Sequence, residues 1–183
     1  MNIIFLDIDG VLCTQRIGFD PGDDLTFIYR LNPLDIYSMK LLNELCSTFD
    51  ARIVISSSWR KIHSENDIFE HFKNHGFLGK FHSDWSTPNL GGFRGKEINE
   101  WLLKNNFSND DNYICIDDDS SDYFPWQNVC SVDSYEGFGF KDFLFCSTVL
   151  KGFKNCEMNN EVLISLFEWQ IEKINRNIEK LRL

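Results

Sequence analysis

The chain has 183 residues, of which 43% are hydrophobic, so it is long enough and apolar enough to bury the core of one ordinary domain. Its formal charge of −10 disfavours broad, non-specific binding to nucleic acid or to an anionic membrane surface. We expect no signal peptide and no membrane association, because the first apolar run ends at Asp7 and no stretch reaches the length of a bilayer-crossing helix.

Short apolar runs alternate with amphipathic segments along the chain, which is typical of β-α-β units on a parallel sheet. The first run, Asn2 to Leu6, is too short and too apolar for an amphipathic helix and predicts a buried central strand. Further strands are expected at 51–55, 77–81, 113–116 and 127–132.

Helix signals lie between these runs. Asn32 and Pro33 predict the start of a first helix, as its cap and first helical residue. Ser64 predicts the cap of a second helix, which Gly76 ends, and a third helix is expected from Lys96.

A long helix is expected over about 160–183, where apolar residues recur at alternating four- and three-residue steps. This stripe either packs against the domain or joins two chains, so we expect a monomer or a homodimer through this helix. The prediction is one domain over 1–183, with a core at about 1–150.

Six cysteines are scattered through the sequence without a C-x-x-C pair, which argues against a structural zinc site. We expect reduced, buried thiols. Together with the expected lack of a signal peptide, this predicts a cytoplasmic protein.

Three polar clusters directly follow three of the predicted strands: Asp7 to Gly10, Ser56 to Arg60, and Asp117 to Asp119. Because the carboxyl ends of parallel strands meet at one edge of a sheet, these clusters should converge there. Converging carboxylates repel unless a cation joins them, and oxygen ligands favour Mg²⁺. Solvated turns would explain one such cluster alone, whereas phosphate chemistry explains all three together.

The sequence Phe5 to Leu12 resembles the first motif of the haloacid dehalogenase (HAD) superfamily of phosphotransferases. Ile53 to Ser56 resembles the second motif, Lys96 fits the third, and Ile114 to Asp118 fits the fourth, in the same order. The serine cluster, the sequence Arg94 to Ile98 and the acidic run more narrowly resemble the HAD domains of "Swiss-army-knife" RNA-repair proteins. The resemblance implies a Rossmann-like three-layer α/β sandwich around a mostly parallel sheet.

The resemblance also implies catalytic roles. Asp7 is the expected nucleophile, since a carboxylate is already ionised at neutral pH. Asp9 is expected to protonate the leaving oxygen and then to activate water. Ser56 would hydrogen-bond a phosphoryl oxygen, and Lys96 would neutralise charge on that group and on Asp7.

The implied metal is Mg²⁺. Its expected ligands are Asp7, the backbone carbonyl of Asp9, and Asp118 with Asp117 beside it. Asp122 follows Asp118 by four residues and is expected as a third or an outer ligand. The runs of three serines and three aspartates leave the register of the second and fourth motifs open by one residue.

Further residues are expected to bind substrate. Gly10 lets the chain turn sharply, and the Ser57 amide would assist Ser56. Arg60 and Arg94 could each grip a phosphate with a guanidinium fork, or could form structural ion pairs.

The aromatic residues Trp59, Trp85 and Phe93 could stack on a base, although packing is the commoner role for such residues. For His63 and His82, ordinary surface or helix-end roles are favoured over contact with substrate.

Neither interval between the motifs is long enough for an inserted cap domain, so a minimal cap and an open site are expected, with 82–95 as a small lid. We therefore predict a Mg²⁺-dependent phosphomonoesterase for a nucleotide or a nucleic-acid terminal phosphate. A small-metabolite or phosphoprotein phosphatase remains an alternative. So does a receiver-like domain, although its motif order differs, or an inactive phosphate-binding module, which would be expected to lose Asp7 or Asp9.

Overall fold

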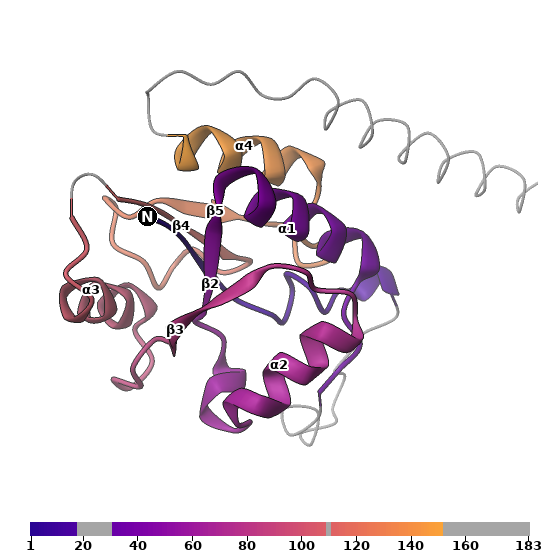
Figure 1. The fold of residues 1–183 in the computed structure, drawn as a ribbon, viewed down its shortest axis with the longest axis horizontal. Helices are drawn as coiled ribbons and strands as arrows, with labels where there is room; N and C mark the ends of the chain where they lie inside the picture. Colours follow the sequence, from indigo (N-terminus) through magenta and orange to yellow (C-terminus); the bar gives the residue numbers. More distant parts are fainter. Residues whose placement is uncertain (18–30, 109–110, 152–183) are drawn as a thin grey trace, which may run out of the picture. The chain divides into compact units, whose positions relative to one another are not determined.

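The computed structural model describes residues 1–17, 31–108 and 111–151. Its centre is a five-stranded, entirely parallel sheet in the order β3-β2-β1-β4-β5 (Figure 1). The strands are β1 (Asn2–Leu6), β2 (Ala51–Ile55), β3 (Lys80–Ser86), β4 (Asn112–Asp117) and β5 (Val129–Ser131). The predicted Rossmann-like α/β fold is confirmed, with β1 in the middle of the sheet.

The register of the three central strands decides where the site forms. Leu6 of β1 pairs with Ile55 of β2 and with Ile116 of β4, so the three strands end at the same level. The Ser56 amide then donates to the Leu6 carbonyl, and the Asp7 amide to the Ile116 carbonyl, both at 3.0 Å. The residues after these strands therefore converge, as the sequence predicts.

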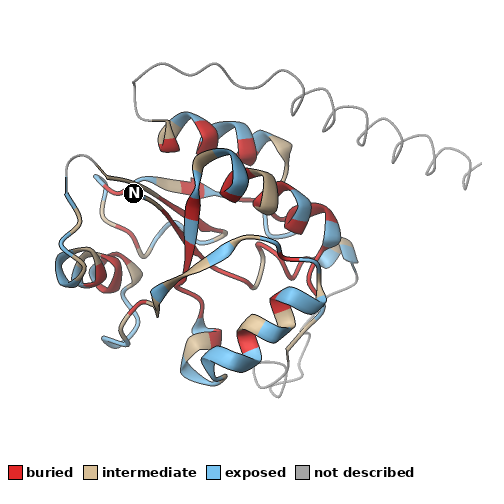
Figure 2. Ribbon diagram, viewed as in Figure 1, coloured by how far each residue is buried: buried red, intermediate tan, exposed pale blue. Residues whose placement is uncertain are grey.

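Four α-helices cover the sheet: α1 (Ile36–Phe49), α2 (Glu65–Asn74), α3 (Arg94–Lys104) and α4 (Phe140–Leu150). The α1 helix packs beside α4, and α4 lies over β4 and β5 (Figure 1). Since crossovers are right-handed, α3, which leads back from β3 to β4, lies on the opposite face from α1. Figure 2 shows the buried strands between these layers.

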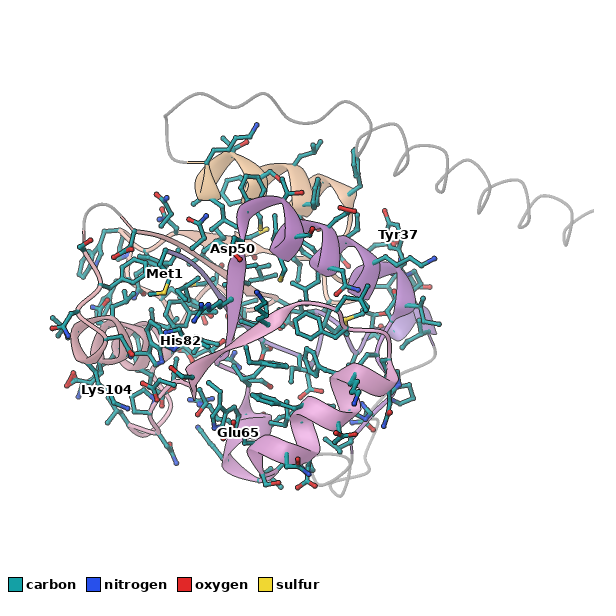
Figure 3. All side chains as sticks on the ribbon, viewed as in Figure 1. Met1, Tyr37, Asp50, Glu65, His82 and Lys104 are labelled. Atoms are coloured by element: carbon teal, nitrogen blue, oxygen red, sulfur yellow. The ribbon has the colours of Figure 1, made fainter. Side chains whose placement is uncertain are left out.

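The α3 face holds a compact apolar core. Ile98 and Trp101 of α3 pack on Ile3 and Phe5 of β1, and the Phe5 and Trp101 rings meet edge to face at 5.2 Å. His82 of β3, labelled in Figure 3, also packs on the Trp101 ring, with ring centroids 4.9 Å apart. His82 thus packs on a core residue from within a strand, which differs from the surface or helix-end role that the sequence favoured.

The second predicted helix agrees with the structure at both ends. Ser64 caps α2 by accepting from the Asp67 amide at 3.3 Å, and the Asp67 carboxylate accepts in return from the Ser64 amide. Gly76 follows the helix with φ of +84°, a conformation that glycine adopts without strain.

The first helix begins later than predicted. Its cap is Asp35, whose Oδ1 accepts from the Tyr37 amide at 2.8 Å. The Asp35 carboxylate also bonds Arg16, and its amide donates to the Leu12 carbonyl at 2.7 Å. These tertiary contacts move the start beyond Asn32 and Pro33.

Other elements also differ from expectation; the fifth strand, for example, covers Val129–Ser131 instead of 127–132. The third strand covers Lys80–Ser86 instead of 77–81, because Lys80 pairs with Arg52 and Ser86 with Ile55. The third helix begins at Arg94, two residues before Lys96. No helix was expected over Phe140–Leu150, although the buried residues Phe143, Cys146, Ser147 and Leu150 have helical spacing.

The interval between β2 and α3 is fully described and contains only a short 3-10 helix (Ser58–Lys61), α2, β3 and a connecting loop. It holds no inserted cap domain, as expected. Residues 18–30 and the predicted helix at 160–183 lie outside the described residues.

Five of the six cysteines lie in the described ranges, and all five are buried and free of disulfides, as predicted. Among the helices of these ranges, none combines the length and hydrophobicity that a membrane crossing requires.

Candidate active site

Three carboxylates meet at the carboxyl edge of the sheet. Asp7 follows β1, Asp117 ends β4, and Asp118 is next to it; one oxygen of each lies within 4.8 Å of the others. Burial and the nearby Asp7 charge raise the pKa of Asp117 to about 7 and also raise the pKa of Asp118. These carboxylates repel one another when ionised, and a nearby cation would stabilise their ionised forms.

Arg94, the first residue of α3, supplies one cation. Its Nη1 lies 2.8 Å from Asp7 Oδ1 and 2.7 Å from Asp117 Oδ2. Although burial opposes it, the charges of Asp7 and Asp117 raise the pKa of Arg94, so the guanidinium stays protonated. Because helical side chains lean toward the N-terminus, a first-turn arginine reaches back to the strand ends.

Lys96, the expected cation, is exposed on α3. Within the described ranges, no ion pair joins its ammonium group to Asp7, Asp117 or Asp118. The structure therefore places Arg94, instead of Lys96, against the acidic centre.

The two adjacent aspartates have different surroundings. Asp117 accepts from Arg94 and from the Tyr123 hydroxyl at 2.5 Å through Oδ2, and from the Asp119 amide at 2.9 Å through Oδ1. Both oxygens of Asp117 are thus engaged by protein donors, which makes this residue an anchor for Arg94.

Asp118 instead lies against Gly10. A Cβ atom on Gly10 would stand 2.4 Å from Asp118 Oδ2, and Gly10 has φ of +73°. Both observations require glycine, and its missing side chain makes room for the carboxylate. Asp118 is the better placed of the two for a metal ion, which agrees with the preferred register of the fourth motif.

Asp9 is held in place by Trp59. Its Oδ2 accepts from the Trp59 indole nitrogen at 3.0 Å, while its buried Oδ1 has no hydrogen-bond partner among the described residues. Burial and the Asp7 charge raise the pKa of Asp9 to about 6, although the Trp59 hydrogen bond lowers it. Near neutral pH this carboxyl group can both bind and release a proton.

Two of the three consecutive serines, Ser56 and Ser57, have different hydrogen-bonding surroundings. Ser57 Oγ accepts from the Trp59 amide at 3.4 Å and caps the 3-10 helix. The buried Ser56 hydroxyl has no partner within the described part of the chain. Ser56 is thus the residue whose hydroxyl remains for an incoming ligand.

Thr87 was missed by the sequence reasoning. It follows β3, its amide donates to the Ile55 carbonyl at 3.0 Å, and its buried hydroxyl has no partner among the residues described. A hydroxyl residue directly after a strand is the signal that marked Ser56, but the predicted strand at 77–81 ended too early to reveal it.

Arg60 lies behind the site. Only 4% of its side chain is exposed, and its guanidinium bonds Glu97 at 2.5 Å, the Ser57 carbonyl at 2.6 Å and the Thr87 carbonyl at 2.9 Å. It also bonds the Ser56 carbonyl. These contacts correspond to the structural alternative for Arg60 and tie the serine loop to the residue after β3.

Other predicted residues take no direct part in the three-carboxylate cluster. The carboxylate of Asp122 is not part of the three-carboxylate cluster; its backbone carbonyl accepts from the Gly95 amide at 2.8 Å. Trp59 is 1% exposed and cannot offer a face to a base, and Trp85 meets the Phe69 ring edge to face. Phe93, at 40% exposure, remains accessible.

The arrangement fits a magnesium ion. The donors at the centre are carboxylate oxygens, the ligands that a hard divalent cation prefers. Burial first, and then the Asp7 charge, raise the pKa values of Asp117 and Asp118, and a bound cation would relieve the repulsion from Asp7. Asp7, Asp118 and the Asp9 backbone carbonyl are the groups that would hold it.

Comparison with known proteins identifies a family for this chain. A family model described as the HAD domain in Swiss Army Knife RNA repair proteins matches residues 3–143. Searches of curated proteins and of solved structures found no match. The matched range runs from β1 into α4 and includes every residue of the site described above, and the family supports HAD-type phosphatase chemistry in general. This chain belongs to the family of HAD domains found in Swiss Army Knife RNA repair proteins.

Proposed function

We propose that this chain is a Mg²⁺-dependent phosphomonoesterase that works through a phospho-aspartate on Asp7. The observation that carries the proposal is the placement of Asp7 Oδ1 at 2.8 Å from the Arg94 guanidinium, inside a cluster of three carboxylates. A nucleophile beside a fixed cation and an acidic metal site suits attack on a phosphate ester.

In the first half of the reaction, an Asp7 carboxylate oxygen attacks phosphorus, and the bond from phosphorus to the ester oxygen breaks. Asp9 gives its proton to that leaving oxygen. The pKa of Asp9, raised to about 6 by burial and by Asp7, leaves a protonated fraction available near neutral pH.

In the second half, the ionised Asp9 takes a proton from a water molecule. The water oxygen attacks phosphorus, the acyl phosphate bond breaks, and Asp7 is regenerated with release of inorganic phosphate. Trp59 holds the Asp9 carboxylate during both proton transfers through its indole N–H, 3.0 Å from Oδ2.

The phosphoryl oxygens need donors that are already in place. Arg94 can supply them together with the Ser56 hydroxyl, which has no partner among the described residues; the Ser57 amide and Thr87 are further candidates. Arg94 thus takes the charge-neutralising role that the resemblance assigned to Lys96. When bound, Mg²⁺ supplies further positive charge to the phosphoryl group.

The preferred substrate class is a nucleotide or a terminal phosphate on RNA or DNA. Membership of a family found in RNA-repair proteins supports this class. So does the lack of a cap domain between β2 and α3, because an open site admits a polymer end. A small-metabolite or phosphoprotein phosphatase of the same superfamily is the alternative.

Phosphate release tests the proposal. Wild type should release phosphate from a nucleoside monophosphate or an RNA oligonucleotide with a terminal phosphate only when Mg²⁺ is present. Asp7→Asn should abolish turnover while its circular dichroism and melting curve stay native. Full activity in Asp7→Asn would rule out the nucleophile, and activity after chelation of all divalent metal would rule out the metal. Preference for a sugar phosphate or a phosphopeptide would favour the alternative.

A further inference from the structure

Three aromatic side chains form an exposed ledge beside the candidate active site: Phe93, Phe124 and Trp126. The Phe93 and Phe124 rings meet edge to face with centroids 5.0 Å apart, and the Phe124 and Trp126 rings stack with centroids 4.7 Å apart and planes 5° from parallel. Trp126 is 70% exposed and Phe93 is 40% exposed. Since Phe124 covers one face of the indole, this exposure requires the other face to be open.

The ledge is held in place by a buried polar clamp. Gln127, 7% exposed, accepts from the Phe124 amide at 2.9 Å and donates to the Gly95 carbonyl at 2.8 Å and to Asn99 at 3.0 Å. The Gly95 amide donates in turn to the Asp122 carbonyl at 2.8 Å. The loop after β4 is therefore fixed to the start of α3, and the rings form a preorganised surface.

The ledge is continuous with the site. Phe93 directly precedes Arg94, whose guanidinium bonds Asp7, and Phe124 directly follows Tyr123, whose hydroxyl bonds Asp117. Because consecutive Cα atoms are only about 3.8 Å apart, both rings are attached one residue away from groups that reach the catalytic carboxylates. The ledge thus lies on the same two segments, the start of α3 and the loop after β4, that bring Arg94 and Tyr123 to the acidic centre.

We propose that this ledge stacks the nucleobase of the nucleotide whose phosphate Asp7 attacks. The inference rests on the proposed function and adds the means by which the substrate class is recognised. Every base offers a π-face, so stacking suits a repair substrate of any sequence. With a net charge of −10, the chain is poorly suited to gripping many backbone phosphates, whereas stacking needs no positive charge.

The variant Trp126→Ala tests the ledge, because the open indole can be removed without exposing the core. Tyr135→Ala is the matched control, an aromatic residue 56% exposed in a different loop. For an RNA oligonucleotide with a terminal phosphate, Trp126→Ala should lower kcat/KM by about 5- to 100-fold, mainly through KM, as loss of one stacked base implies. Glycerol phosphate, which has no ring, should be hydrolysed unchanged by both variants. The loss should also vary little with salt concentration.

Several results would overturn the ledge. If Trp126→Ala lost as much kcat/KM on glycerol phosphate as on the oligonucleotide, the ledge would have only a structural role. If it lost none on either substrate, the ledge would have no role in binding substrate. The same loss on a phosphopeptide would assign it to apolar groups in general. If wild type hydrolyses none of these substrates, the phosphatase proposal fails. The ledge is then tested separately by equilibrium binding of the same oligonucleotide to wild type and to Trp126→Ala. Weaker binding by the variant would support base stacking on the ledge, and equal binding would rule it out.

Discussion

Arg94 Nη1 lies 2.8 Å from Asp7 Oδ1, while Lys96, two residues further along α3, is exposed to solvent. The same Arg94 nitrogen reaches Asp117 Oδ2 at 2.7 Å, so one guanidinium joins the residue after β1 to the last residue of the neighbouring strand β4. This contact supports the proposal that Arg94, instead of Lys96, neutralises charge on the phosphoryl group.

Substitution of the two cations should have very different effects. Arg94→Ala removes charge from the position where the phosphoryl group develops negative charge, and we expect kcat to fall about 100- to 1000-fold. Lys96→Ala should change kcat less than about twofold, since surface substitutions away from a site have small effects. Phosphate release under saturating Mg²⁺ measures both.

Arg94→Lys distinguishes charge from geometry. It keeps the positive charge but not the planar fork, and it should recover part of the activity that Arg94→Ala loses. A larger loss in Lys96→Ala than in Arg94→Ala would return the role to Lys96.

Trp59 should act as a positioning residue for Asp9. Trp59→Phe removes the indole donor, and kcat should fall about 10- to 100-fold, the range for a hydrogen bond to a charged group, with little change in KM. Because that hydrogen bond lowers the pKa of Asp9, its loss should move the corresponding limb of the pH–rate profile to higher pH.

Trp101→Phe is the control for Trp59→Phe. Trp101 is equally buried, and its indole nitrogen donates to the Asp84 carbonyl at 2.9 Å, on the core side of α3. This variant should lower the melting temperature but leave kcat and the pH profile in place. Equal losses of kcat in both variants would reduce the role of Trp59 to packing.

The stabilising effect of Mg²⁺ should depend on pH. The pKa of Asp9 is about 6 and that of Asp117 about 7, against 3.8 for an ordinary aspartate, because both are buried near Asp7. A carboxyl group with a raised pKa in the fold contributes stability below its unfolded pKa, and this contribution is lost as pH rises through the folded pKa. The metal-free protein should thus lose this stability between about pH 4 and pH 7.

Melting curves with EDTA and with Mg²⁺ measure this effect. The increase in Tm on adding Mg²⁺ should be larger at pH 7.5 than at pH 5, because protons compete for the carboxylates at lower pH. Asp118→Asn should lose most of the increase at both values. An equal or larger increase at pH 5 would contradict a metal site made of these carboxylates.

Arg60 should matter for stability. Arg60→Met leaves Glu97, which is 1% exposed, without its ion-pair partner, and should cost about 3–5 kcal/mol in the free energy of unfolding. Lys104→Met removes an exposed ion pair with Asp84 and should cost no more than about 1 kcal/mol. Urea unfolding compares the two. An Arg60→Met protein with normal stability and a raised KM would instead restore Arg60 to substrate binding.

Much of the fold could be predicted from local patterns. The strands at 2–6 and 51–55 are short apolar runs that only a buried parallel strand explains, and both match the structure residue by residue. Ser64 and Gly76 also marked α2 correctly, because capping depends on neighbouring residues. The start of α1 was placed too early, since Asp35 is favoured by Arg16 and Leu12, which the chain brings there from another segment.

The sequence by itself determined that Asp7, Ser56 and Asp117 lie at one edge of the sheet, because residues that follow buried parallel strands share that edge. Only the tertiary structure decided what each side chain does there. On α3, the side chain of Arg94 and not that of Lys96 reaches Asp7. Arg60 pairs with the buried Glu97 instead of facing the acidic centre. The aromatic ledge beside Asp7 likewise depends on the clamp between α3 and the loop after β4, and such long-range contacts leave no periodic signal in the chain.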